Sequence, residues 1–165
     1  MITSAHIKAG LLNYLRFNKG MVTATEVKTI CGFADIMAYC LHSRHMIEVE
    51  VKTNIQDLKN EIRNKSNKHY CIKHPEKYGY KYIPNRYYIC VPAEILEDAK
   101  PIIESINENY GIIVYTHLYN GKDDTGIINV KSAKSLHVKK QNGYLCTISK
   151  RLSCEVAKLR MEKLG

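Results

Sequence analysis

The sequence contains no tryptophan and only two phenylalanines, and none of its apolar runs reaches the roughly 18 residues of a membrane-spanning helix. Its amino-terminal stretch, MITSAHIKAG, also lacks the basic segment followed by a long apolar segment that marks a secretory signal. Six cysteines occur, but none belongs to a Cys-x-x-Cys pair. We therefore expect a soluble cytoplasmic protein with reduced cysteines and no membrane role.

Acidic residues are scarce relative to basic ones. The chain has 25 Lys and Arg against 16 Asp and Glu, which gives a formal net charge of +9 and an isoelectric point near 9.2. This surplus favours a polyanionic partner, with nucleic acid first and an anionic membrane surface second. A basic protein that is merely soluble is the remaining alternative. The 165 residues, 45% of them hydrophobic, suit a single domain over residues 1–165.

The first third of the chain predicts a helix, three strands and a second helix. Residues 3–17 carry apolar side chains at helical spacing and are followed by the glycine of NKG. The runs 21–30, 34–40 and 46–53 are extended and closely spaced, which favours an antiparallel meander. A helix that Asn54 caps then runs to about residue 66.

The middle of the chain predicts a β-α-β unit. Residues 67–85 are rich in tyrosine and lysine and are expected to form a long irregular connection. A buried strand at 86–91, a helix opening at Pro92 and a strand at 111–116 follow. Two strands joined in this way are expected to be parallel.

An extension of about residues 117–165 follows a core of about residues 5–116. Residues 120–130 are expected to make a hairpin-like excursion. A final helix is expected over about residues 148–163. Its apolar face consists of Ile148, Leu152, Val156 and Leu159.

The predicted meander brings acidic residues together. A turn centred near residue 43 places Asp35 beside positions 50 to 52, and a turn between residues 30 and 31 places Glu26 opposite Asp35. Glu50 and Lys52 are two residues apart on one strand, so they share a face, whereas Val51 points toward the core. Three acids and a lysine are therefore expected to converge.

Such a group has the chemistry of a metal-dependent hydrolase. Neighbouring carboxylates repel one another unless a cation lies between them, and Mg²⁺ prefers oxygen ligands. We expect Asp35 and Glu50 to bind Mg²⁺ or Mn²⁺ with the carbonyl oxygen of Val51. Lys52 would orient or help to deprotonate the attacking water and stabilise charge on a phosphate.

The pattern Asp35, fourteen residues, then Glu50-Val51-Lys52, within an α-β-β-β-α-β order, resembles the PD-(D/E)xK restriction-endonuclease-like nucleases. Within them it is most similar to the MmcB-related DNA-repair proteins, on the segments ATEV, GFADIMA, EVEVKT and NIQDLKNEI. The resemblance covers residues 5 to 116. It implies an α/β fold with a mixed central sheet flanked by helices, and a deoxyribonuclease of DNA repair, recombination or phage DNA processing.

Position by position, the resemblance assigns metal binding to Asp35 and Glu50, the catalytic lysine to Lys52 and an additional acid to Glu26. The sequence departs from the family pattern at two places. Ala34 stands where a proline often precedes the aspartate, and residues 3–17 contain no acid although many members carry one in the first helix.

DNA contacts are expected from the basic, tyrosine-rich segment, where cations face phosphates and rings can stack on bases. The residues concerned are Lys65, Lys68, His69, Tyr70, Lys73, Lys77 and Lys81. The spacings CLHSRH and HYCIKH also allow a zinc site, although neither follows a standard paired-ligand pattern. Association into a homodimer is a further expectation, since nucleases that cut both strands often pair.

Two other functions fit the same sequence. The first is a catalytically silent DNA-binding module that keeps the fold and the basic surface. The second is a regulatory or structural protein without a nucleic-acid partner. Only the second predicts that behaviour toward DNA is insensitive to salt.

Overall fold

The computed structural model describes residues 2–30, 32–116 and 126–164. Its centre is a six-stranded sheet in the order β1-β2-β3-β4-β5-β6. Strands β1 to β3 are antiparallel, β3 to β5 are parallel, and β6 is antiparallel to β5. The strands are β1 (Val22–Thr29), β2 (Gly32–Tyr39), β3 (Met46–Val51), β4 (Arg86–Pro92), β5 (Gly111–Tyr115) and β6 (Ile127–Lys131).

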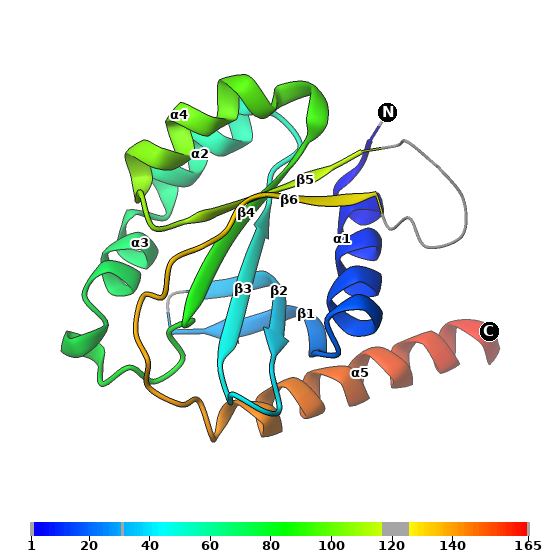
Figure 1. Ribbon diagram of the computed structural model, residues 1–165. Coiled ribbons are helices and arrows are strands. Elements are labelled where there is room, and N and C mark those ends of the chain that lie inside the picture. The colour runs from blue at the N-terminus through cyan, green and yellow to red at the C-terminus, as the bar shows by residue number, and fades with distance from the viewer. Residues whose placement is uncertain (1, 31, 117–125, 165) are drawn as a thin grey trace.

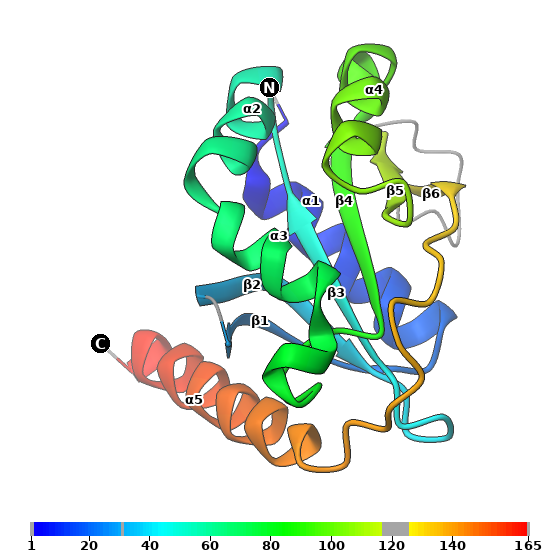
Figure 2. The same cartoon turned by 90° about the vertical axis from the view of Figure 1, so that its left-hand side faces the viewer.

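Helices lie on both sides of this sheet, which makes the fold α/β with a mixed central sheet (Figures 1 and 2). Helix α1 lies on one side, whereas α2, α3 and α4 lie on the other, and α5 crosses the end formed by β1 and β2. The helices are α1 (Ser4–Asn13), α2 (Ile55–Asn64), α3 (Ser66–Lys73), α4 (Leu96–Ile106) and α5 (Tyr144–Leu164). Short turns are the π-helical η1 (Tyr14–Asn18) and the 3₁₀ helices η2 (Pro75–Tyr78) and η3 (Ala93–Ile95).

Side-chain alternation along β3 divides the core into layers. Val49 and Val51 pack under α1 with Ile7 and Leu11, which are one helical turn apart. Glu48 and Glu50, which alternate with these valines along β3, point to the opposite side of the sheet. A second cluster, under α2 and α4, is centred on Tyr87 of β4. Successive residues of one strand thus serve two different layers.

The predicted register of the meander is confirmed. Val22 pairs with Tyr39 and Ile36 pairs with Val49, as turns centred at the expected positions require. Strands β4 and β5 are parallel, as the β-α-β reading predicted. The side chain of Asn54 accepts a hydrogen bond from the Asp57 N–H and caps α2.

Three local predictions were wrong. The connection at 67–85 contains α3, because Lys68, Cys71 and Ile72 are buried at helical spacing against the sheet. Helical spacing places Ile62 on one face of α2 with Ile55 and Leu58, but Ile62 is exposed and Glu61 is buried, so the inward face carries a charge. Both departures involve ion pairs, Glu61 with Lys52 and Lys68 with Glu50, which a pattern of hydrophobic residues does not predict.

The third wrong prediction concerns the two later helices. Pro92 ends β4 instead of opening a helix, and α4 continues through Pro101. Helix α5 begins at Tyr144, earlier than expected, and only the first part of its apolar face is covered. Ile148 is fully buried against β1 and β2, whereas Leu159 is 58% exposed.

The predicted hairpin excursion at 120–130 lies partly outside the described residues. Its second half is β6, which pairs with β5 and so joins the extension to the central sheet. Within the described ranges, no helix is long and apolar enough to cross a membrane.

We predict that Ile148→Ala and Leu159→Ala have different effects on the free energy of unfolding, because only the first half of α5 is docked on the sheet. Removing the buried Ile148 side chain should lower the free energy of unfolding by about 2–5 kcal/mol, because a cavity remains in the core. The matched Leu159→Ala change should stay within about 0.5 kcal/mol. Urea denaturation measures both values, and equal losses would contradict the partial docking of α5.

Candidate active site

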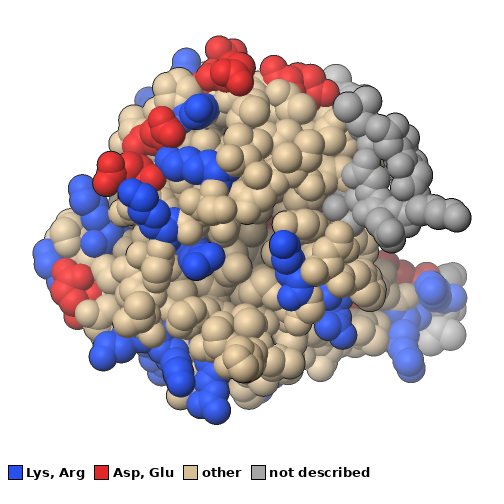
Figure 3. Space-filling model, viewed as in Figure 1, with Lys and Arg blue, Asp and Glu red and all other residues tan. Residues whose placement is uncertain are grey.

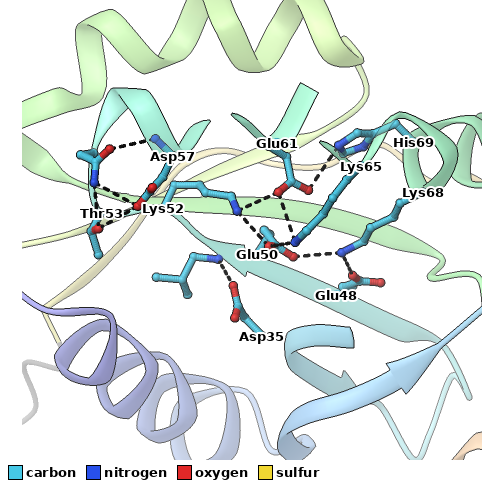
Figure 4. Close-up of polar contacts among 12 residues, drawn as sticks. Asp35, Glu48, Glu50, Lys52, Thr53, Asp57, Glu61, Lys65, Lys68 and His69 are labelled. Atoms are coloured by element: carbon cyan, nitrogen blue, oxygen red, sulfur yellow. Dashed lines mark hydrogen bonds and ion pairs between the residues drawn. The ribbon is translucent and has the colours of Figure 1, made fainter. Parts of the chain in front are cut away.

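Asp35 lies where β2 and β3 separate. The pairing of the two strands ends with Ile36 opposite Val49, and Asp35 is the next residue on β2. Its Oδ2 accepts a hydrogen bond from the Val51 N–H at 2.8 Å, so the carboxylate takes a donor at the end of β3 (Figure 4). The structure thus brings Asp35 and Val51 together, through the N–H of Val51.

Lys8 of α1 joins Asp35 to Glu26. Its Nζ is 2.8 Å from Asp35 Oδ1 and 2.5 Å from Glu26 Oε1. Burial of Lys8 opposes its charge, but hydrogen bonds to Asp35 and Glu26 outweigh this and raise the pKa of the ammonium. Glu26 lies opposite Asp35, as expected, with a left-handed backbone (φ 49°) that is rare for a residue with a side chain. Sequence reasoning had noted the missing acid in this helix but not the lysine.

Glu50 points to the other side of the sheet, toward α2 and α3 (Figure 4). Its Oε1 is 3.0 Å from Lys52 Nζ and also contacts Lys65, while its Oε2 is 2.9 Å from Lys68 Nζ. Glu50 and Lys52 therefore share a face, as predicted, but the expected convergence of this pair with Asp35 and Glu26 is not found, since those two acids contact Lys8 of α1 on the other side of the sheet. That face is covered, because the Glu50 side chain is only 3% exposed.

Glu48, Glu61 and His69 complete this buried group, and sequence reasoning missed the roles of all three. Glu48 lies 2.5 Å from Lys68 Nζ. Glu61 of α2 lies 2.7 Å from Lys52 Nζ, 3.2 Å from Lys65 Nζ and 3.3 Å from His69 Nε2. The sequence did contain a signal for this group: Glu61, Lys65 and Lys68 recur at helical spacing, and the strand at 46–53 carries acids on one face.

These residues form what we call the ionic layer: Glu48, Glu50, Glu61, Lys52, Lys65 and Lys68. Three carboxylates face three ammonium groups, so the layer is neutral when every member is charged. Burial opposes ionisation of Glu50 and Glu61, but Lys68 for Glu50, and the His69 hydrogen bond and Lys52 for Glu61, outweigh it and hold the pKa of both carboxyls below the ordinary value of 4.5. Burial of Lys52 also opposes its charge, but Glu50 and Glu61 raise its pKa, so this lysine stays protonated.

Glu48 is the exception in this layer. Burial of its carboxyl, which is 1% exposed, outweighs the attraction of Lys68 and raises the pKa. Lys68 itself has a raised pKa, because Glu48 and Glu50 overcome the effect of its burial.

Donor chemistry for a divalent cation is present at Asp35 and Glu26. Mg²⁺ is commonly bound by one or two carboxylates together with water and substrate phosphate. The position between these two carboxylates already suits a cation, since the Lys8 ammonium lies there. Both oxygens of Glu50 face lysines instead. In the described part of the chain, no three His, Cys, Asp or Glu side chains converge as metal ligands.

The expected DNA-contacting residues fall into two groups. Lys65, Lys68 and His69 turn inward to the ionic layer, and Lys68 is only 4% exposed, so the expectation of a surface contact is corrected for it. The outward residues are Tyr70, Lys73, Lys77 and Lys81. Lys77 Nζ donates to Tyr70 Oη at 2.7 Å and lies over its ring.

Basic side chains gather at the lower left of Figure 3, over the α3–β4 connection and the segment before α5, whereas acidic ones gather over α4. Lys139 and Lys140 line a hollow there together with Lys81. The surface around the outward residues is therefore electropositive.

The zinc reading gains no support from the placement of its residues. His69 contacts Glu61 and the Tyr110 hydroxyl, and Cys71 is buried in the core. Around Cys40 and His45, as elsewhere in the described ranges, no metal-binding group of three is formed.

We predict that Glu61→Gln reduces the fall in the free energy of unfolding at acid pH, which is the acid limb of the stability curve. Glu61 and Glu50 have depressed pKa values, so their stabilising effect is complete above about pH 4.5 and is lost as pH falls through the lower folded-state values. The variant should be about 3–5 kcal/mol less stable at neutral pH, because lysines are left uncompensated. Urea unfolding between pH 3 and 7 measures this, with the exposed Glu97→Gln as control; an unchanged acid limb would contradict the role of Glu61.

Comparisons with known proteins inform on the fold of this chain and not on its function. No family model and no curated protein matches the chain. Among solved structures it is similar to SPO1766, a protein of unknown function from Silicibacter pomeroyi, with a TM-score of 0.67 and 13% sequence identity. The match covers 99% of this chain and 94% of that one. At this identity the likeness concerns the arrangement of the backbone: an α/β fold with a mixed sheet.

Proposed function

We propose that this protein is a metal-dependent nuclease of the restriction-endonuclease-like fold that hydrolyses DNA phosphodiester bonds. The observation that carries the proposal is the position of Asp35 at the separation of β2 and β3, beside Glu26 and one strand away from Glu50-Val51-Lys52. Asp35 is 21% exposed and Glu26 is 48% exposed, so a substrate can approach this pair.

In this proposal Asp35 and Glu26 hold Mg²⁺ or Mn²⁺ in the position that the Lys8 ammonium takes. A bound ion would supply Lewis-acid polarisation of the phosphate and a water of lowered pKa. The site is a two-carboxylate one in place of the expected set of Asp35, Glu50 and the Val51 carbonyl. Glu50 acts through Lys52, which it keeps charged and in place.

Lys52 then serves as a fixed positive charge. Its raised pKa makes it a poor base, so it does not deprotonate the water. In this proposal its ammonium, which is 12% exposed and held on the α2 side of the sheet by Glu50 and Glu61, would stabilise negative charge on a phosphate that reaches across the end of β3 from Asp35 and Glu26. The net charge of +9 and the outward lysines favour approach of DNA.

We predict that Asp35→Asn lowers cleavage about a hundredfold or more while DNA binding is kept or strengthened. An asparagine oxygen can still accept from the Val51 N–H, so the fold should survive. Labelled single-stranded, duplex, flapped and four-way DNA with Mg²⁺ or Mn²⁺ measures cleavage, and fluorescence anisotropy measures binding.

The control is Asp98→Asn, which removes an exposed carboxylate on α4, and EDTA should stop cleavage by the unmodified protein. Binding of DNA without metal-dependent cleavage of any substrate would refute the nuclease assignment.

A catalytically silent DNA-binding module is the second candidate, and one observation favours it. Protein cations already neutralise the acids of the motif: Lys8 contacts Asp35 and Glu26, and Lys65 and Lys68 contact Glu50. An internal ammonium in a cation position competes with a divalent ion.

We predict that Lys8→Met strengthens Mn²⁺ binding about tenfold or more, because a positive charge in contact with two ligands is removed while the apolar stem is kept. Isothermal titration calorimetry measures the affinity without any need for activity. Lys100→Met is the charge-matched control, because the Lys100 side chain is exposed on α4. Equal affinities for unmodified protein and Lys8→Met would show that Lys8 does not compete with metal.

A further inference from the structure

A cavity of about 470 Å³ opens beside the end of α1, on the side of the sheet that α1 covers. Its apolar floor includes Leu15, Met21 and Ile113 of the core under α1. Polar groups enter it from η1, from the β2–β3 turn, from β4 and from β6. This volume falls within the roughly 300–1,000 Å³ of small-molecule sites.

The charge of the cavity is one-sided. Lys19 and Arg86 line it and are exposed, His45 also lines it, and among the described residues no Asp or Glu is part of its lining. The two permanent cations come from different parts of the chain, the residue that follows η1 and the first residue of β4. An anionic group such as a phosphate fits this arrangement, and Arg can bind it in a bidentate manner.

Aromatic rings form the walls of the same cavity. Tyr14 lines it with Lys19 Nζ 5.3 Å from its ring centre, and Tyr88 lines it from β4. The Tyr88 ring lies against Gly111, where a Cβ would come within 2.3 Å of two ring carbons. The glycine thus makes room for the ring. Cations next to rings suit a ligand that has a phosphate and a flat base.

The cavity also lies in line with the candidate active site. Ile47 lines the cavity, and Val51, which binds Asp35, is four residues further along β3. Four residues of a strand span about 13 Å. Lys8 and the cavity residue Tyr14 both belong to the α1–η1 segment. Because α1 covers the sheet on this side, one nucleic-acid strand that reached both places would run along α1.

We propose that this cavity binds one nucleotide of the DNA strand, with its phosphate at Lys19 and Arg86 and its base against the tyrosines. A nucleotide a few positions from the scissile bond would then fix the register of the strand. The proposal rests on the proposed function for its role, but binding of the nucleotide is independent of cleavage. The cavity residues are distinct from the outward lysines of the α3–β4 connection.

Cys40 provides a reporter inside the cavity. Hydrogen bonds from Ser43 lower the pKa of its thiol, which favours alkylation. Cys146 and Cys154 are exposed on α5 and serve as internal references. The experiment treats the Asp35→Asn protein with N-ethylmaleimide in EDTA and follows each cysteine by peptide mass spectrometry. It compares protein alone, a short single-stranded oligodeoxynucleotide, and thymidine monophosphate.

We expect the oligodeoxynucleotide to slow alkylation of Cys40 about fivefold or more and to leave the two reference cysteines unchanged. Arg86→Ala should abolish this protection and weaken oligonucleotide binding about tenfold, whereas the charge-matched Lys100→Ala should change it less than about twofold.

Protection by thymidine monophosphate but not by the oligonucleotide would overturn the strand assignment, because the site would then serve free nucleotides. Equal reactivity of Cys40 with and without either probe, or protection that survives in Arg86→Ala, would overturn the site. The alkylation experiment measures no cleavage, so its result holds even if the nuclease proposal fails. The cleavage assay tests the nuclease proposal, and protection of Cys40 tests the nucleotide site.

Discussion

Neutral pairing of charges inside the ionic layer is the condition on which the site depends. Three glutamates and three lysines lie between the sheet and helices α2 and α3, where isolated charges would cost several kcal/mol each. Glu48 and Glu50 come from β3 and Glu61 from α2, while Lys52 follows β3, Lys65 joins α2 to α3 and Lys68 belongs to α3, so the contacts fix the helices against the strand. Lys52 gains its charge and its position from the same contacts.

The alternation of β3 connects this layer to the rest of the molecule. Its valines bind the strand to α1 through apolar packing, and its glutamates bind it to α2 and α3 through ion pairs. Asp35 lies at the end of β3, with one oxygen accepting from the β3 backbone and the other in contact with Lys8 of α1. A substrate that contacts Asp35 would therefore meet a carboxylate with both oxygens held. Such rigidity is what positioning of a reacting phosphate requires.

The α1 side of the sheet and the α3–β4 surface offer two different kinds of positive charge. On the α3–β4 surface, Lys77 and Lys81 are exposed side chains that suit phosphates of any sequence. On the α1 side, Lys19 and Arg86 stand at a cavity with aromatic walls, which suits a single nucleotide. Under the proposed function, separate groups would therefore contact an extended DNA strand and set its register.

The sequence by itself determined the strand order of the meander, its register and the meeting of Asp35 with Glu26 and position 51, because short turns and a period of two leave little freedom. Only the tertiary structure decided that Lys8 joins Asp35 to Glu26, and that Lys65 and Lys68 point inward. Those contacts join residues of different elements, and a helix's rotation about its axis depends on what packs against it. In α2 an ion pair set that rotation: Glu61 is buried and Ile62 exposed, opposite to what hydrophobicity alone predicts.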